Sequence, residues 1–104
     1  MPTIHSVTQY NYQFHGGASG YQGNRAVLRL KNGNTSVAYV YFKPEGITLP
    51  SDTNTGSWIK MYLPESLIPA VMETLRNESP ISVYYASGSG FLITGNEPVG
   101  EEES

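Results

Sequence analysis

Three residues of the segment Trp58–Leu63 carry side chains that could bind a ligand together. Side chains alternate between the two faces of a strand, so Trp58, Lys60 and Tyr62 share one face and three apolar residues occupy the other. Two aromatic rings around one cation can stack nucleic-acid bases and hold phosphate groups. The same combination also packs sheets against neighbouring proteins, so both interpretations remain open.

The sequence gives little support for catalysis. His5 and His15 are the residues best suited to act as bases near neutral pH, and no acid lies in the same alternating stretch to orient either of them. Neither a Gly-x-Ser-x-Gly nucleophile elbow nor a His-Glu-x-x-His metal motif occurs. We therefore expect a protein that is not an enzyme.

Cofactor and metal sites are also not predicted. The chain contains no cysteine, which excludes disulfides, thiolate metal sites and a thiol nucleophile. Asp52, Asn54 and Gly56 resemble the opening of a calcium-binding loop, but the closing acidic ligand of such a loop would fall at Leu63. We expect no calcium site there.

Acidic residues are concentrated at the end of the chain. Four of the nine acids, Glu97 and Glu101 to Glu103, lie in the last eight residues, whereas residues 1–96 carry five acids and all six bases. This distribution predicts one β-rich domain over residues 1–96 and an acidic, disordered tail over residues 97–104. A weakly basic body with an acidic tail is compatible with an anionic partner and equally with an ordinary solvated surface.

No signal peptide and no apolar run of membrane-spanning length is evident. We therefore expect a cytoplasmic protein with no membrane partner.

A β-hairpin over residues 25–43 is the strongest structural signal. Asn32-Gly33 predicts a type I′ turn, which needs positive φ at both central positions. With those two residues as the loop, Leu28 would face Val37 and Ala26 would face Tyr39. One face would then carry Ala26, Leu28, Leu30, Val37 and Tyr39, and the other would carry Val27, Ala38 and Val40, with Arg25 and Arg29 at its rim.

The remaining periodicity predicts four further strands and one helix. Residues 3–15 alternate between aromatic and amide side chains, and the amides could face solvent, a partner chain or base edges. Strands are also expected over residues 58–63, 81–86 and 91–94. A helix is expected over residues 66–77, with Ser66 as N-cap, Pro69 in its first turn and Asn77 closing it in a left-handed conformation. The fold class is mainly β (α+β): a small, strongly bent antiparallel sheet or barrel of about five to six strands with one helix.

Two segments of the chain resemble the motifs of the Sm-like family of RNA-associated proteins. The first is Val27-Leu28-Arg29-Leu30-Lys31-Asn32-Gly33 with the strand that follows to Phe42. The second is a pair of short strands joined by a tight glycine-containing turn, from Val83 to Ser89 and from Phe91 to Ile93. Together these segments cover about a third of the chain.

The resemblance implies an Sm-like barrel and a homo-oligomeric ring. In such a ring the strand Ile81–Ala86 would pair with the strand Phe91–Thr94 of the next copy. Single-stranded RNA or DNA would bind near the pore, with a role in RNA or DNA processing. By position, the implied binding residues are Lys43, Ser87, Gly88 and Ser89, and Tyr41 could stack a base; Lys60 joins them from the strand pattern. The alternative is a self-assembling structural or protein-interaction module that binds no nucleic acid.

Overall fold

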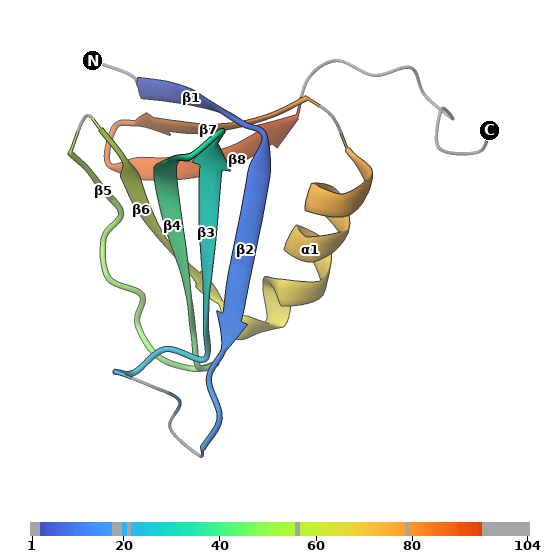
Figure 1. Cartoon of the computed structure of the whole chain (residues 1–104). Coiled ribbons are helices and arrows are strands. Elements are labelled where there is room, and N and C mark those ends of the chain that lie inside the picture. The colour runs from blue at the N-terminus through green and yellow to red at the C-terminus, as the bar shows by residue number, and fades with distance from the viewer. Residues whose placement is uncertain (1–2, 18–19, 21, 56, 79, 95–104) are drawn as a thin grey trace.

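The computed structural model describes residues 3–17, 20, 22–55, 57–78 and 80–94 (Figure 1). The predicted acidic tail, residues 97–104, lies outside this part of the chain. The described elements are β1 (Thr3–Val7), β2 (Gln9–Phe14), β3 (Ala26–Asn32), β4 (Thr35–Lys43), β5 (Thr53–Asn54), β6 (Ile59–Pro64), the 3₁₀ turn η1 (Glu65–Leu67), α1 (Ile68–Asn77), β7 (Ile81–Ala86) and β8 (Ser89–Thr94). The mainly-β prediction with one α-helix is confirmed.

The strands form two sheets rather than one. Sheet A has the order β1-β7-β8 and sheet B the order β2-β3-β4-β6-β5. The predicted strand over residues 3–15 is divided at Thr8, so that β1 belongs to sheet A and β2 to sheet B (Figure 1). The Thr8 N–H donates to the Lys31 carbonyl at 2.8 Å, and the Thr8 hydroxyl accepts from the Gly33 N–H at 2.8 Å. These two bonds fix the chain where it passes from one sheet to the other.

A closed barrel is not found in the described residues, and the sheets are not wholly antiparallel. β4 and β6 pair in parallel, with Tyr39 opposite Lys60 and Tyr41 opposite Tyr62. A parallel neighbour requires a long connection, which residues 44–58 provide. The prediction of an antiparallel sheet was therefore wrong for this pair. The sheets are joined by the β1–β2 segment, whereas β6 and β8 approach each other without pairing.

The hairpin β3–β4 forms, but its predicted register was wrong. Asn32 pairs with Thr35, so the two loop residues are Gly33 and Asn34. Gly33 has φ of 63°, and Asn34 is not among the described residues with positive φ. A glycine with positive φ at the first loop position is the pattern of a type II′ turn rather than the predicted type I′ turn.

A register shift between Leu30 and Lys31 then changes which residues share a face. Leu30 pairs with Ala38, Leu28 with Val40 and Ala26 with Phe42; all six are buried and face the core. Tyr39 pairs with Arg29 and lies on the opposite face, so the predicted grouping of Tyr39 with the leucines was wrong. The predicted placement of Ala38 and Val40 beside Val27 was also wrong.

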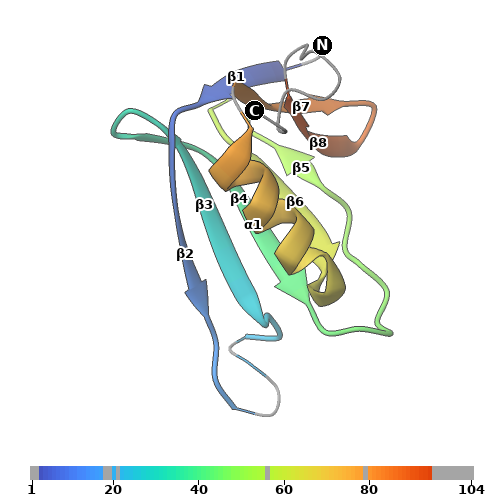
Figure 2. The same cartoon turned by 90° about the vertical axis from the view of Figure 1, so that its right-hand side faces the viewer.

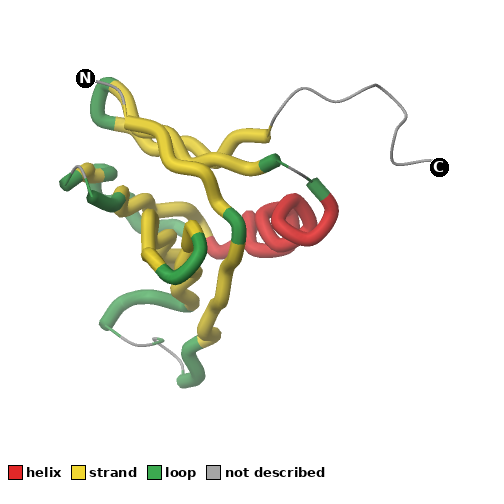
Figure 3. The backbone as a smooth tube through the Cα atoms, turned by 45° about the horizontal axis from the view of Figure 1, so that its top comes forward, coloured by secondary structure: helices red, strands yellow, loops and turns green. Residues whose placement is uncertain are grey.

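The core lies between the two sheets and the helix. Figure 2 shows α1 lying across one face of sheet B, and Figure 3 shows sheet A crossing its upper end as a second layer. Met72 and Leu75 contribute the buried stripe of α1, and Ile81 and Val83 contribute that of β7. The apolar alternation of β6 is confirmed, because Ile59 and Met61 are buried in the same cluster.

The helix has other boundaries than the sequence predicted. Ser66 lies in η1, and its backbone N–H donates to Glu45 Oε2 at 2.8 Å, while Leu67 is the N-cap of α1. Pro69 lies in the first turn as predicted. Asn77 is the last helical residue and is not among the described residues with positive φ, so the predicted left-handed closure was wrong. The Asn77 side chain instead donates to the Glu73 carbonyl at 3.1 Å.

The last hairpin turns earlier than predicted. Ser87 and Gly88 have φ of 54° and 84°, as a two-residue type I′ turn requires, and Ala86 pairs with Ser89. Gly90 therefore belongs to β8 rather than to the turn. A side chain at position 90 would collide with Met61 Cγ, which explains a glycine inside this strand.

No helix in the described part of the chain has the length and apolar character needed to cross a membrane.

Candidate nucleic-acid interface

The face of sheet B that points away from the core carries aligned aromatic and basic residues. Strand register places Lys60 beside Tyr39 and Tyr39 beside Arg29 in one row. The next row along the strands contains Tyr62 and Tyr41. α1 and sheet A lie on the other side of sheet B (Figure 2). The side chains of this face are half-buried, except that of Arg29, which is exposed. We call this set the outer face; it consists of Arg29, Tyr39, Tyr41, Lys43, Trp58, Lys60 and Tyr62.

The four rings of the outer face form two contacting pairs. Tyr39 and Trp58 meet edge to face, with ring centroids 5.3 Å apart and an interplanar angle of 87°. Tyr41 and Tyr62 are stacked, with centroids 5.6 Å apart and an angle of 25°. Neighbouring strands bring these rings together, because cross-strand side chains on one face lie in contact.

The three cations of the outer face lie against these rings. Lys60 Nζ is 5.6 Å from the Tyr41 centroid and 5.7 Å from the Trp58 centroid, so it bridges the two ring pairs. Arg29 Cζ lies 5.8 Å from the Tyr39 centroid. Lys43 Nζ lies 5.6 Å from the Tyr62 centroid. Each contact at a partly exposed site contributes about 0.5–1 kcal/mol and holds a positive charge close to an aromatic surface.

The amide side chains of β2 extend the same face. Gln9 pairs with Lys31, Asn11 with Arg29 and Gln13 with Val27, so the three amides lie beside the outer face, and all three are exposed. Each amide offers both a donor and an acceptor. The outer face and its amide border therefore combine positive charge, ring surface and hydrogen-bonding groups on one side of the sheet.

The structure brings together three of the residues predicted to bind nucleic acid. Tyr41, Lys43 and Lys60 all belong to the outer face, and Lys60 contacts the Tyr41 ring. Ser87, Gly88 and Ser89 lie instead at the β7–β8 turn of sheet A. Sequence reasoning missed Arg29 and Tyr39 as members of the site, since the predicted hairpin register placed them on different faces.

The ring geometry implied by the Sm-like resemblance does not fit the strand order. It requires Ile81–Ala86 to pair with a strand of the next copy. In the structure this strand, β7, already has β1 on one side and β8 on the other. A ring would have to use other strand edges.

The two histidines lie in different parts of the fold. His5 lies in β1, whereas His15 follows β2, and His15 Nδ1 is 3.0 Å from the Asn24 carbonyl oxygen. Within the described ranges, no group of three or more His, Cys, Asp or Glu residues is placed to hold a metal ion. Asp52, the first residue of the segment that resembles a calcium-binding loop, accepts hydrogen bonds from the backbone N–H groups of Tyr62 and Gly90.

No protein-family model, curated protein or solved structure matches this chain.

Proposed function

We propose that this protein binds single-stranded nucleic acid, with RNA as the first candidate, on the outer face of sheet B, and that it does so without catalysing a reaction. The observation that carries the proposal is Lys60, which lies between the Tyr41 and Trp58 rings on the outer face. Exposed bases stack on aromatic rings while neighbouring cations hold the phosphates. A duplex hides its base faces, so aromatic rings that stack on bases favour single strands.

The small number of cations argues that one copy binds weakly. Three cations on the outer face allow only a few phosphate contacts, whereas a homo-oligomer would repeat the surface along one strand. The proposal therefore includes an assembly of identical subunits, with a closed ring as its first form and a role in RNA or DNA processing. Such a ring must form through edges other than those of β7.

Trp58 provides a direct test, because it is the only tryptophan in the chain. Titration with single-stranded oligouridine and oligothymidine should quench its fluorescence, and added salt should weaken the binding. Tyr41→Leu should reduce the affinity, since about 1–3 kcal/mol is lost when a stacked base loses its ring. The matched control is Tyr12→Leu, a ring of β2 that contacts Tyr10 and Phe14 rather than the outer face. The proposal would be contradicted if the parent protein and both variants were quenched equally at each oligonucleotide concentration. It would also be contradicted if added salt did not change the affinity.

A self-assembling module without nucleic-acid binding is the second candidate, and one observation favours it. On the outward side of sheet A, strand register aligns Ile4, Tyr84 and Phe91, and Ile4 and Phe91 are 59% and 45% exposed. Exposed apolar residues in a row suit an interface between copies. Native mass spectrometry that shows a closed oligomer, together with no polyanion binding at low salt, would favour this candidate over the first.

A further inference from the structure

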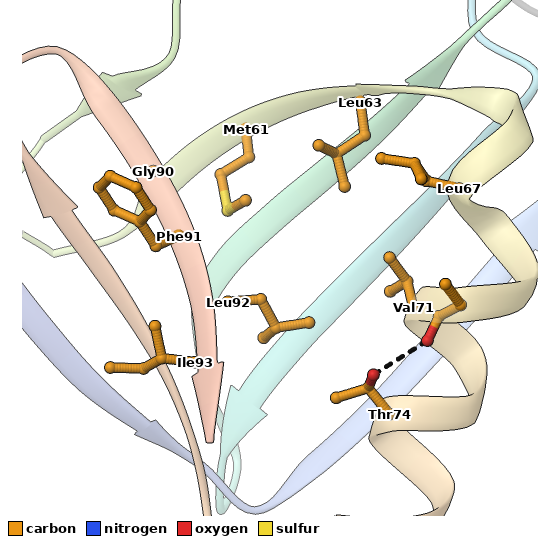
Figure 4. A pocket seen from close by; sticks show the side chains of 10 residues that line it. Met61, Leu63, Leu67, Val71, Thr74, Gly90, Phe91, Leu92 and Ile93 are labelled. Atoms are coloured by element: carbon orange, nitrogen blue, oxygen red, sulfur yellow. Dashed lines mark hydrogen bonds between the residues drawn. The ribbon is translucent and has the colours of Figure 1, made fainter. Parts of the chain in front are cut away.

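An apolar groove lies between β8 and α1, on the opposite side of the molecule's core from the outer face. Figure 4 shows β8 on one side, α1 on the other and the end of β6 above. The groove has a volume of about 380 Å³. Its lining consists of Met61, Leu63, Leu67, Ala70, Val71, Thr74, Gly90, Phe91, Leu92 and Ile93, none of which is charged.

One wall of the groove is an unpaired strand edge. In the described residues β8 pairs with β7 alone. In a hairpin with a two-residue turn, Ala86 and Ser89 bond to each other, so along β8 the backbone groups of Gly90, Leu92 and Thr94 point away from β7. The Gly90 N–H confirms this direction, because it donates to Asp52 Oδ2 at 2.8 Å. Beyond Gly90, the outward backbone groups of Leu92 border the groove, and those of Thr94 continue the same strand edge.

The geometry points to an extended apolar peptide of another protein as the occupant, bound as an additional strand on the edge of β8 with alternate side chains in the groove. The unpaired edge supplies main-chain hydrogen bonds to an extended partner. The uncharged lining suits apolar side chains, and the exposed rim residues Leu67 and Phe91, at 41% and 45%, would lose contact with water.

The helix argues against a second copy as the occupant. A strand that belongs to a folded sheet carries a neighbouring strand on one side. Across the groove from β8, α1 stands where that neighbour would lie (Figure 4). A single extended peptide fits between the strand edge and the helix. An edge strand of sheet B from another copy does not fit, because the rest of its sheet would meet the helix.

Peptide selection tests this inference with the full chain. A phage-displayed library of random ten-residue peptides should enrich sequences with apolar residues at alternate positions. An enriched peptide should protect the Leu92 and Thr94 amides from hydrogen exchange. Methylation of alternate backbone nitrogens of that peptide keeps its side chains and removes donors, and it should weaken binding at least about tenfold.

Two variants separate the groove from other surfaces. Ala70→Glu places a charge in the groove at an exposed helix position, and it should abolish peptide binding while the fold is retained. Arg76→Glu introduces the same side chain on a different part of α1, outside the groove, and should leave binding unchanged. The inference is overturned if no sequence with alternating apolar residues is enriched, or if the methylated peptide binds as well as the parent peptide. It is also overturned if Ala70→Glu does not change peptide binding, or if the Leu92 and Thr94 amides become protected by dimerisation in the absence of peptide.

Discussion

Asp52 Oδ2 accepts a hydrogen bond from the Gly90 backbone N–H at 2.8 Å, which joins the long loop after β4 to the edge of β8. The other oxygen of the same carboxylate, Oδ1, accepts from the Tyr62 N–H in β6 at 3.0 Å. β6 and β8 belong to different sheets and form no ladder with each other. One carboxylate therefore links a strand of sheet B to a strand of sheet A.

Replacement of Asp52 should loosen this link. Asp52→Asn keeps the size of the side chain but leaves only one oxygen to accept, so one backbone N–H loses its partner. We expect the free energy of unfolding to fall by about 1–3 kcal/mol, as measured by urea denaturation. Glu73→Gln, the same change of charge at an exposed position of α1, should leave stability within about 0.5 kcal/mol of the parent. Equal stability of both variants would show that the carboxylate does not hold the sheets together.

A second prediction concerns the contact between β8 and the core. A Cβ at position 90 would collide with Met61 Cγ and lie 3.1 Å from Met61 Sδ, and Met61 is buried. Gly90→Ala should therefore destabilise the protein by about 1–3 kcal/mol. Gly16→Ala is the control, because nothing lies within 4 Å of its added Cβ.

The collision can be isolated by a double-mutant cycle. In a Met61→Ala background the atoms that Gly90→Ala would strike are absent, so the added methyl group should cost less, although Met61→Ala itself is destabilising. Strictly additive costs would indicate that Gly90 is required for a reason other than its approach to Met61.

The sequence predicted the type of most elements because their local signals are strong. The alternation of Trp58–Leu63 and the helical spacing of Val71, Met72 and Leu75 both reflect burial on one side, which the structure confirms. The existence of the β3–β4 hairpin followed from its glycine turn. Its register did not, because the shift between Leu30 and Lys31 leaves no mark in the residue types.

The candidate site was predictable only in part for the same reason. Trp58, Lys60 and Tyr62 share a face within one strand, so alternation alone grouped them. Arg29 and Tyr39 join them through pairing across strands, which depends on the register shift and on the parallel contact of β4 with β6. Parallel pairing through a loop of more than ten residues has no local signal, since nothing in the loop specifies which strand its end will meet.

A third prediction separates charge from packing on the outer face. Lys60→Gln removes the cation that bridges Tyr41 and Trp58. If Lys60 contacts a phosphate of single-stranded nucleic acid, the slope of log affinity against log salt should fall by about 0.7 in magnitude. Arg76→Gln, on α1, should leave the slope unchanged. An unchanged slope for Lys60→Gln would indicate that this lysine only packs between the rings.

The acidic end of the chain gives the last prediction. Residues 97–104 carry Glu97, Glu101, Glu102 and Glu103, and their removal takes away four negative charges that repel a polyanion. We expect the truncated protein to bind single-stranded oligonucleotides roughly threefold to tenfold more tightly at low salt, and the difference to shrink as salt screens the repulsion. A full-length variant with glutamine in place of these four glutamates should reproduce the gain, because it removes the charge and keeps the chain. Higher affinity in the truncated protein but not in the glutamine variant would show that the size of the tail, rather than its charge, weakens binding. Unchanged affinity in both proteins at low salt would show that the tail stays clear of the outer face.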